Sequence, residues 1–367
     1  MISNSINAAK LLTVFMASEP APEDDDITDG IYVGKTLVYN LPFFLNNSKL
    51  INPHISIVGM TGSGKSYLLK SMIMRMLISS KVNVLIIDWS SEYSQLVMGL
   101  GGNVRRDIDR NVRLVDFLCN RISSIDLSTI KDPSIAGCVA RDILIEVSKS
   151  MSCSELNERV SWVIVIDEAW KLADYEKVLG RLFREGRKFG FSIIVATQLM
   201  KDVNNEILAN AACSFVFRLQ GSDNFDALSS SGLLKYNDVE TVKSLKRGCC
   251  VVSMRNRSNF EQNFVVKVEG FSFKSYSLSF CGEKMKMSKE SISNAISNMG
   301  IDTEGRLKLF RFFEDAGQSL DLVQVISMMM GLGVKRIDII SFFSELGVDE
   351  ASVALSIESI KGVRAFD

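Results

Sequence analysis

A glycine-rich segment that directly follows a short apolar run constrains this chain more than any other feature. The apolar run covers residues 55–58, and the segment has the pattern Gly-x-x-x-x-Gly-Lys-Ser. In such a segment backbone N–H groups converge on phosphate oxygens, Lys65 reaches the β and γ oxygens, and Ser66 can hold Mg²⁺. An ordinary glycine-rich turn is the alternative, but the preceding strand and the apolar helix expected over residues 67–77 favour a nucleotide site. We therefore expect ATP and Mg²⁺ to bind at Gly59, Met60, Thr61, Gly62, Ser63, Gly64, Lys65, Ser66 and Tyr67.

A second apolar run, residues 162–166, ends in two carboxylates, Asp167 and Glu168. A buried parallel strand of this form delivers its last side chains to the sheet edge that also carries the phosphate loop. We expect Asp167 to join the Mg²⁺ shell and Glu168 to polarise the attacking water. An acidic pair that only caps the next helix is the alternative. The pair favours hydrolysis of a nucleotide over transfer to a small-molecule hydroxyl.

A third apolar run, residues 191–198, ends in Gln198, which can touch both the γ-phosphate and the water. Before it, residues 175–188 predict a helix that has one apolar face, carries several arginines and ends at Gly190. An arginine at this helix end could act as a finger on the ATP of a neighbouring subunit in a ring. For any single arginine, a solvated basic face is the alternative.

These motifs together resemble the HerA/FtsK superfamily of P-loop ATPases. Beside the phosphate loop, the resemblance rests on Asp88 and Glu92 after the second strand, the Ile-Asp-Glu-Ala-Trp run at 166–170, the Arg-Glu-Gly-Arg-Lys-Phe-Gly run at 184–190 and the Ala-Thr-Gln run at 196–198. It covers about residues 30–270, and the last two runs are much more specific than the phosphate loop alone. Within the superfamily, the chain is most similar to archaeal HerA-like ATPases and to ATPases of conjugative type IV secretion, including archaeal DNA-import relatives.

The resemblance implies a homohexameric ring that pumps DNA through its pore. It also implies a finger arginine before the Thr-Gln strand, a position that Arg187 matches best and Arg184 second. Two features of the family are not recognised in this sequence, the small N-terminal β-barrel of HerA proteins and the large N-terminal domain of conjugative ATPases. Docking to a membrane-channel or nuclease partner through such a domain is therefore left open.

The charge balance limits how this chain could contact DNA. A net charge of −1 gives no overall attraction to nucleic acid, so a DNA contact must be local. One candidate contact is the set of arginines within residues 99–113, and the other is a group of basic residues between 243 and 257. In both cases the alternative is an ordinary charged surface loop. The second group comprises Lys243, Lys246, Arg247, Arg255 and Arg257.

Other compositional features indicate a cytoplasmic protein. No apolar run approaches the roughly 18 residues of a membrane span, and no signal peptide is recognised. The seven cysteines lack metal-site spacing and are expected in the core of a protein in a reducing compartment. The single histidine, His54, is expected to be structural, because Glu168 already supplies a base.

Alternating strands and helices predict an α/β fold with a mainly parallel sheet, the RecA-like (ASCE) P-loop NTPase architecture. We expect a mobile N-terminal arm at 1–30, a motor domain at 31–281 that begins with a β-hairpin at 31–47, and a small helical domain at 282–367. Within the motor, a helical insert is expected between the strand ending at Asp88 and residue 157. Within the helical domain, a weak 30-residue repeat aligns the paired phenylalanines 312–313 with 342–343.

The function expected from these features is an ATP-driven ring motor that translocates DNA in transfer, import or DNA processing. Two alternatives remain open. One is a viral-type genome-packaging ATPase, or a secretion ATPase whose cargo is protein. The other is a nucleotide-gated assembly factor, whose hydrolysis switches a partner complex without moving DNA.

Overall fold

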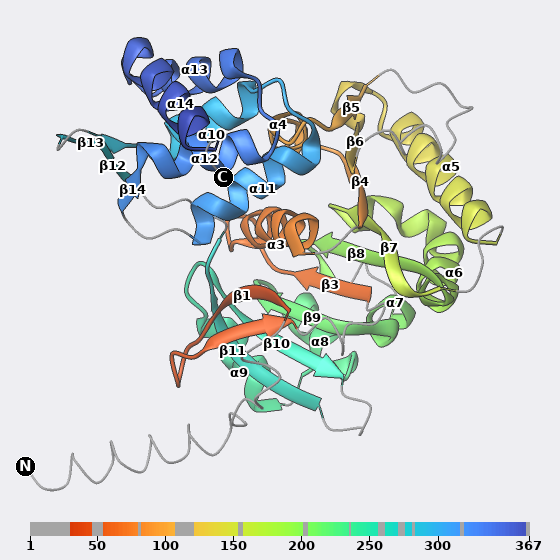
Figure 1. Cartoon of the computed structure of the whole chain (residues 1–367). Helices are drawn as coiled ribbons and strands as arrows, with labels where there is room; N and C mark the ends of the chain where they lie inside the picture. Colours follow the sequence, from red (N-terminus) through yellow and green to blue (C-terminus); the bar gives the residue numbers. More distant parts are fainter. Residues whose placement is uncertain are drawn as a thin grey trace, which may run out of the picture. The chain divides into compact units, whose positions relative to one another are not determined.

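In the structure, a computed structural model, the chain forms two compact units. Figure 1 shows their helices and strands. The first unit falls within Met1–Glu92, Arg105–Cys119 and Ser124–Gly270, and the second within Tyr93–Val104, Asn120–Ser123 and Phe271–Asp367. The chain passes between the units several times, the last time after residue 270. The domain boundary expected after residue 281 stays a prediction. The described residues are 30–45, 54–79, 82–106, 121–152, 157–200, 205–234, 236–255, 261–270, 276–280, 283–315 and 319–364, so most of the expected arm lies outside them.

A large mixed sheet organises the first unit, with the strand order β2-β1-β11-β10-β9-β3-β8-β7-β4-β6-β5. The neighbours β9-β3-β8-β7-β4 are paired in parallel, and β2-β1-β11-β10-β9 are paired antiparallel. The predicted mainly parallel P-loop sheet and its lead-in hairpin are therefore confirmed. The strands are β1 (Ile31–Thr36), β2 (Pro42–Leu45), β3 (His54–Val58), β4 (Asn83–Asp88), β5 (Asn103–Arg105), β6 (Ile122–Asp126), β7 (Asn157–Ile166), β8 (Phe189–Thr197), β9 (Ala211–Phe217), β10 (Cys249–Arg255) and β11 (Glu261–Val268).

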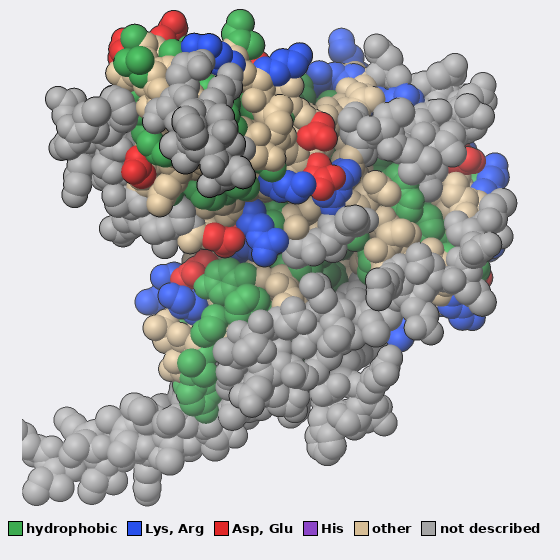
Figure 2. Space-filling model, in the orientation of Figure 1, with side chains coloured by type: hydrophobic (Ala, Val, Ile, Leu, Met, Phe, Trp, Pro, Cys, Tyr) green, Lys and Arg blue, Asp and Glu red, His purple; other side chains and the backbone are tan. Residues whose placement is uncertain are grey.

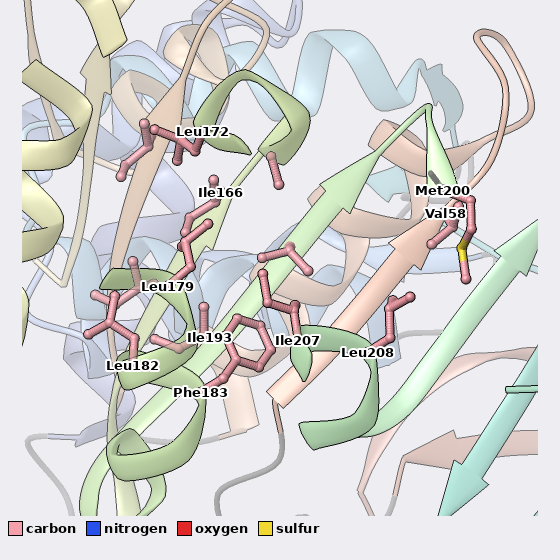
Figure 3. Packing of buried hydrophobic residues seen from close by; sticks show 14 of the residues in the cluster. Val58, Ile166, Leu172, Leu179, Leu182, Phe183, Ile193, Met200, Ile207 and Leu208 are labelled. Atoms are coloured by element: carbon pink, nitrogen blue, oxygen red, sulfur yellow. The ribbon is translucent and has the colours of Figure 1, made fainter. Parts of the chain in front are cut away.

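Helices cover the central strands because these strands are apolar on both faces. One face forms a core with α5 and α6, in which Leu179 and Phe183 of α6 lie near Ile193 of β8 (Figure 3). The alternate residues of the strands, such as Ile57, are equally buried, and the buried side of α3 supplies their cover. The helices of the first unit are α3 (Lys65–Ser79), α5 (Pro133–Ser152), α6 (Glu176–Glu185), α7 (Asn205–Asn210), α8 (Ser222–Ser230) and α9 (Tyr236–Ser244), with 3₁₀ segments η2 (Leu127–Thr129), η3 (Ala169–Tyr175) and η4 (Gly186–Lys188). Helix α4 (Ser94–Gly99) belongs to the second unit.

Two expectations about the motor are wrong in detail. The insert before residue 157 is not only helical, because it contributes β5 and β6 to the sheet. The helix expected over 175–188 is broken, since α6 ends at Glu185 and the chain continues as η4 straight into β8. The break falls at the buried Gly186, where an added Cβ would lie 3.3 Å from the His54 ring, so glycine fits this close contact better than a larger residue.

The second unit is helical but also contains a small sheet. Its helices are α10 (Lys289–Asn298), α11 (Thr303–Asp315), α12 (Leu322–Gly331), α13 (Arg336–Glu345) and α14 (Glu350–Arg364). The strands β12 (Tyr276–Phe280), β13 (Glu283–Met287) and β14 (Ser319–Asp321) form a sheet in the order β13-β12-β14, which the purely helical expectation missed.

The paired phenylalanines of the weak repeat do meet in this unit. Phe313 of α11 and Phe342 of α13 lie with ring centroids 6.3 Å apart, and Phe342 contacts Phe343 edge-on at 5.1 Å. All three rings are almost fully buried. Their packing contributes apolar burial and favourable ring geometry to the helical core.

Candidate nucleotide site

The phosphate loop joins the end of β3 to the start of α3, and its backbone requires glycine. Gly62 and Gly64 have φ of +74° and +121°, a region that L side chains rarely adopt. At Gly59 an added Cβ would lie 2.5 Å from Cβ of Phe217. The first amides of α3 have no partner within their own helix, so the loop delivers unsatisfied N–H groups to an anion.

Three neighbouring segments hold the loop in place. The Gly59 amide donates to the Thr197 carbonyl at the end of β8 (3.2 Å), and the Met60 amide donates to the Arg218 carbonyl just after β9 (2.9 Å). The Ser63 carbonyl accepts from the amide of Gly248, just before β10 (2.8 Å). The loop is therefore preorganised by the strands on either side of β3.

Lys65 lies folded into the loop. Its Nζ donates to the carbonyls of Gly59 (2.6 Å) and Met60 (3.3 Å), and the residue is only 7% exposed. Burial lowers the pKa of Lys65, and the nearby carboxylates of Glu168, Asp167 and Glu92 oppose this shift. The ammonium group thus lies among the acidic side chains that the sequence assigned to the same site.

The carboxylates at the ends of β4 and β7 have defined partners. Asp167 is buried, its amide donates to the Ile87 carbonyl at the end of β4 (3.4 Å), and its Oδ1 accepts from the Glu168 amide (2.9 Å). Asp88 is fully buried, and its Oδ1 accepts from the amides of Ser90 (3.1 Å) and Glu92 (3.2 Å). Asp88 therefore shapes the turn after β4.

The site residues fit a nucleotide with Mg²⁺. The Ser63 hydroxyl is buried without a hydrogen-bond partner among the described residues, and it belongs to the loop that would surround the phosphates. Ser66 starts α3 and Asp167 ends the neighbouring acidic strand, so a hydroxyl and a carboxylate, both oxygen ligands that Mg²⁺ accepts, are available. Tyr67 follows Ser66; its hydroxyl accepts from the Gly270 amide at 3.0 Å, and the residue is 52% exposed.

A side-chain network joins Glu168 to the phosphate loop through Gln198. The Gln198 amide nitrogen donates to Oε1 of Glu168, and its Oε1 accepts from the Thr61 hydroxyl at 2.5 Å. The second oxygen of Glu168 accepts from the indole N–H of Trp170 at 2.5 Å. The expected base, the expected γ-phosphate sensor and the loop thus lie within one hydrogen-bonded chain.

The expected finger arginines lie elsewhere. Arg184 is in the last turn of α6 and Arg187 is in η4, and both are exposed. Arg187 precedes β8, whereas Gln198 follows it; β8 is nine residues long, and its last part pairs in parallel with β3. At about 3.3 Å per residue, the two ends of β8 are about 30 Å apart. Neither arginine therefore reaches the phosphate loop of its own chain.

His54 is a core residue at the opposite end of β3 from the phosphate loop. It is 3% exposed, its Nδ1 accepts from the Ile193 amide (3.0 Å), and its ring lies 4.7 Å from that of Phe183. Burial lowers the pKa of His54 to about 4, and the positive charge of Arg187 adds to this effect. The expected structural role of this histidine agrees with its surroundings.

We predict that His54 makes the fold acid-sensitive. The pKa of His54 is near 6.5 in the unfolded chain and about 4 in the fold. The stability that the neutral ring provides is therefore complete above pH 6.5 and is lost as the pH falls towards 4. The unfolding free energy should decrease by roughly 3 kcal/mol over this window. The chain has a single histidine, so NMR titration of its ring reports it directly, and His54→Asn is the non-titrating control. A ring that titrates near pH 6.5 would contradict the prediction.

Comparison with known proteins relates the site to a family. A family model described as "Helicase HerA, central domain" matches residues 31–141. The DNA import protein CedB of Sulfolobus acidocaldarius is 23% identical over 333 aligned positions, which cover 64% of this chain and 55% of CedB. The DNA double-strand break repair helicase HerA of Sulfurisphaera tokodaii is 25% identical over 164 positions, which cover 40% of this chain and 33% of the helicase.

Among solved structures, VirB4 of Thermoanaerobacter pseudethanolicus resembles this chain with a TM-score of 0.55 and 15% identity. The similarity covers 68% of this chain and 98% of the VirB4 chain, and it concerns the fold. The chain is thus similar in sequence to P-loop ATPases of the HerA/FtsK type. The chain spans about half the length of CedB and a third of that of the HerA helicase.

The residues expected to contact DNA have mixed surroundings. Arg106 forms an ion pair with the buried Asp126 (3.0 Å), and Lys243 forms one with Glu240 (2.6 Å). Lys246 and Arg247 are exposed and directly precede Gly248, which bonds the phosphate loop. Residues 107–120 and 256–260, and the side chain of Arg255, lie outside the described part. In Figure 2, basic and acidic side chains are interspersed among the described residues of the visible face.

Sequence reasoning missed the contact between Trp170 and Glu168. The residue contributed only to the family resemblance, although it stands two positions after Glu168. An indole that close to a strand-end carboxylate was the available signal, but whether its N–H meets the carboxylate depends on both rotamers. Within the described part of the chain, no helix combines the length and hydropathy that crossing a bilayer requires.

Proposed function

We propose that this protein hydrolyses ATP with Mg²⁺ and uses the energy to move DNA, acting as a ring of six subunits. The observation that carries the hydrolytic part is the network of Thr61, Gln198 and Glu168 beside Lys65. A hydrolase needs a cation for the β and γ phosphates, a base for the water and a polar group that contacts both. These three groups belong to different elements and lie together at one edge of the sheet.

In this proposal each residue has one task. The loop amides and Lys65 bind the phosphates, and Ser66 and Asp167 hold Mg²⁺, which would neutralise phosphate charge that develops during the reaction. Glu168 accepts a proton from the attacking water. Gln198, which bridges Thr61 and Glu168 in this structure, positions that water and responds to the γ-phosphate.

The cargo is proposed from the relatives. CedB is named a DNA import protein and HerA a DNA double-strand break repair helicase, and both names concern DNA. A motor coupled to duplex DNA should hydrolyse ATP several times faster when DNA is present. We expect this stimulation for the wild-type protein and its absence for Glu168→Gln. An ATPase rate that is identical with and without DNA would favour a nucleotide-gated assembly factor.

The ring is proposed because Arg187, the arginine expected to act as the finger, lies far from the phosphate loop of its own chain. Arg187 lies about 30 Å from the phosphate-loop edge, given the nine residues of β8 at about 3.3 Å each. An exposed arginine at the far edge can reach only the nucleotide of another subunit. This position supports Arg187 as a finger in trans, with Arg184, one helical turn earlier, as the second candidate.

We predict that Arg187→Ala binds ATP normally and loses turnover by on the order of 10³-fold, as for fingers of related NTPases. Mixed with Lys65→Ala, it should regain part of the activity, because junctions form where an intact loop meets an intact Arg187. The measurement is ATP turnover at several mixing ratios, with mixed rings verified by mass. The control is Arg181→Ala, an exposed arginine of α6 that is ion-paired with Glu185 (3.0 Å).

Two outcomes would contradict the assignment. No recovery at any ratio, in rings of confirmed mixed composition, would remove support for action in trans. Full activity of Arg187→Ala alone would transfer the role to Arg184.

A further inference from the structure

The indole of Trp170 touches the catalytic carboxylate directly. Its Nε1 donates to Oε2 of Glu168 at 2.5 Å, a short bond to a group that is charged when it acts as a base. We infer that Trp170 is a positioning residue, whose N–H holds the Glu168 carboxylate in the orientation that activates water. This inference rests on the proposed ATP hydrolysis.

The backbone of Glu168 is already fixed. Its φ of +49° lies in the left-handed region, which is unfavourable for glutamate, and the surrounding bonds maintain it. The Glu168 amide donates to Oδ1 of Asp167 (2.9 Å), and the Glu168 carbonyl accepts from the Lys171 amide (3.0 Å). The remaining freedom lies in the side-chain torsions, which Gln198 and Trp170 restrict.

Of the two donors to Glu168, Trp170 has fewer competing tasks. Gln198 also bonds Thr61 of the phosphate loop and, in the proposed reaction, responds to the γ-phosphate. It must therefore change partners during a cycle. The indole N–H is a donor only, and the structure gives it one acceptor, Oε2 of Glu168. Trp170 can hold the carboxylate while Gln198 moves.

Lys171 and Trp89 fix the indole in turn. The Lys171 ammonium lies 5.7 Å from the Trp170 ring centroid and 5.1 Å from the Trp89 ring centroid. The two tryptophans follow β7 and β4, which pair in parallel with Ile166 beside Ile87. A cation shared by two rings at the same sheet edge restrains Trp170 against rotation.

Substitution of Trp170 by Phe tests the inference because it keeps a ring and removes the N–H. We expect kcat for ATP to fall about tenfold, which corresponds to about 1.4 kcal/mol, with KM and nucleotide affinity within about twofold of wild type. The matched control is Trp162→Phe. Trp162 is 8% exposed and stacks on Phe191, away from the carboxylates, so this change should lower stability and leave kcat unchanged.

A second test separates positioning from general damage. Glu168→Asp shortens the side chain and withdraws the carboxylate from the indole, so adding Trp170→Phe to it should cost no further activity. An additive loss would show that Trp170 acts by another route and would overturn the inference. So would an unchanged kcat of Trp170→Phe, or a loss expressed only in KM.

A third measurement needs no turnover and does not depend on Trp170→Phe folding. The chain has three tryptophans and therefore three indole N–H signals in a ¹H–¹⁵N spectrum, which Trp89→Phe and Trp162→Phe assign by elimination. Glu168→Gln should shift the Trp170 signal most, and an unmoved signal would overturn the inference. If wild-type protein fails to hydrolyse ATP, or Glu168→Gln hydrolyses it normally, the proposed function fails as well. If the wild-type protein and Glu168→Gln behave as proposed and only Trp170→Phe leaves kcat unchanged, the inference about Trp170 alone is wrong.

Discussion

Replacing Lys65 by Ala is expected to reduce ATP turnover to background, a loss of at least about 100-fold, which is typical when one preorganised charge is removed from a reacting group. In this structure Lys65 is the cation that lies inside the phosphate loop, bonded to the carbonyls of Gly59 and Met60. With the ammonium absent, only Mg²⁺ would offset the repulsion between the nucleotide phosphates and the carboxylates of Glu168 and Asp167. Nucleotide affinity should fall together with turnover.

The fold should survive this substitution, because the apolar face of α3 that holds the helix in place is unchanged. The matched control is Lys70→Ala, which removes a lysine farther along the same helix and should retain activity. Turnover and binding of a fluorescent ATP analogue measure the effect, and circular dichroism verifies the fold. Wild-type turnover by Lys65→Ala would mean that this loop is not the nucleotide site.

Glu168→Gln should separate binding from hydrolysis. The substitution preserves the size of the side chain and removes the base, and general bases typically contribute 10²–10⁴-fold, so turnover should fall by at least about 100-fold. ATP with Mg²⁺ should still bind, because Lys65 and the loop are intact, and the stalled state should favour a stable ring. Rapid quench and size measurement with ATP present would detect both effects.

The control for Glu168→Gln is Glu92→Gln. Glu92 is exposed, follows β4, and is close enough to Lys65 to influence its pKa. Glu92→Gln should retain most of the activity. Normal turnover by Glu168→Gln, combined with a loss of turnover in Glu92→Gln, would show that Glu168 is not the base. Glu92 would then be the carboxylate that activates the water.

Much of the site could be predicted from sequence because its chemistry is tied to backbone geometry. The phosphate loop needs glycine where φ is positive, as at Gly62 and Gly64, and a fixed spacing places Lys65 at the start of the helix. Parallel strands end at one edge of a sheet, so polar residues after two apolar runs predict a shared site. Glu168 and Gln198 meet for this reason.

Other features depend on contacts that a linear pattern does not contain. Strand β6 has the sequence Ile-Ser-Ser-Ile-Asp, and its serines look like loop residues although Ser123 and Ser124 are buried. Asp126 at its end is also buried. Burial by itself raises the pKa of Asp126, but hydrogen bonds from Ser128, Ser91 and Arg106 outweigh it and lower the pKa to about 2. The sequence does not show that Arg106 pairs with the buried Asp126, and Arg106 was for this reason among the residues expected to contact DNA.

We propose above all that ATP hydrolysis at this site moves the protein along DNA. Displacement of a short third strand from a duplex that carries a triplex measures movement without requiring strand separation. We expect displacement that depends on ATP and Mg²⁺ for the wild-type protein, and none for Glu168→Gln, although that variant binds ATP. Wild-type protein that hydrolyses ATP on the same DNA at full rate and leaves the third strand in place would contradict the claim.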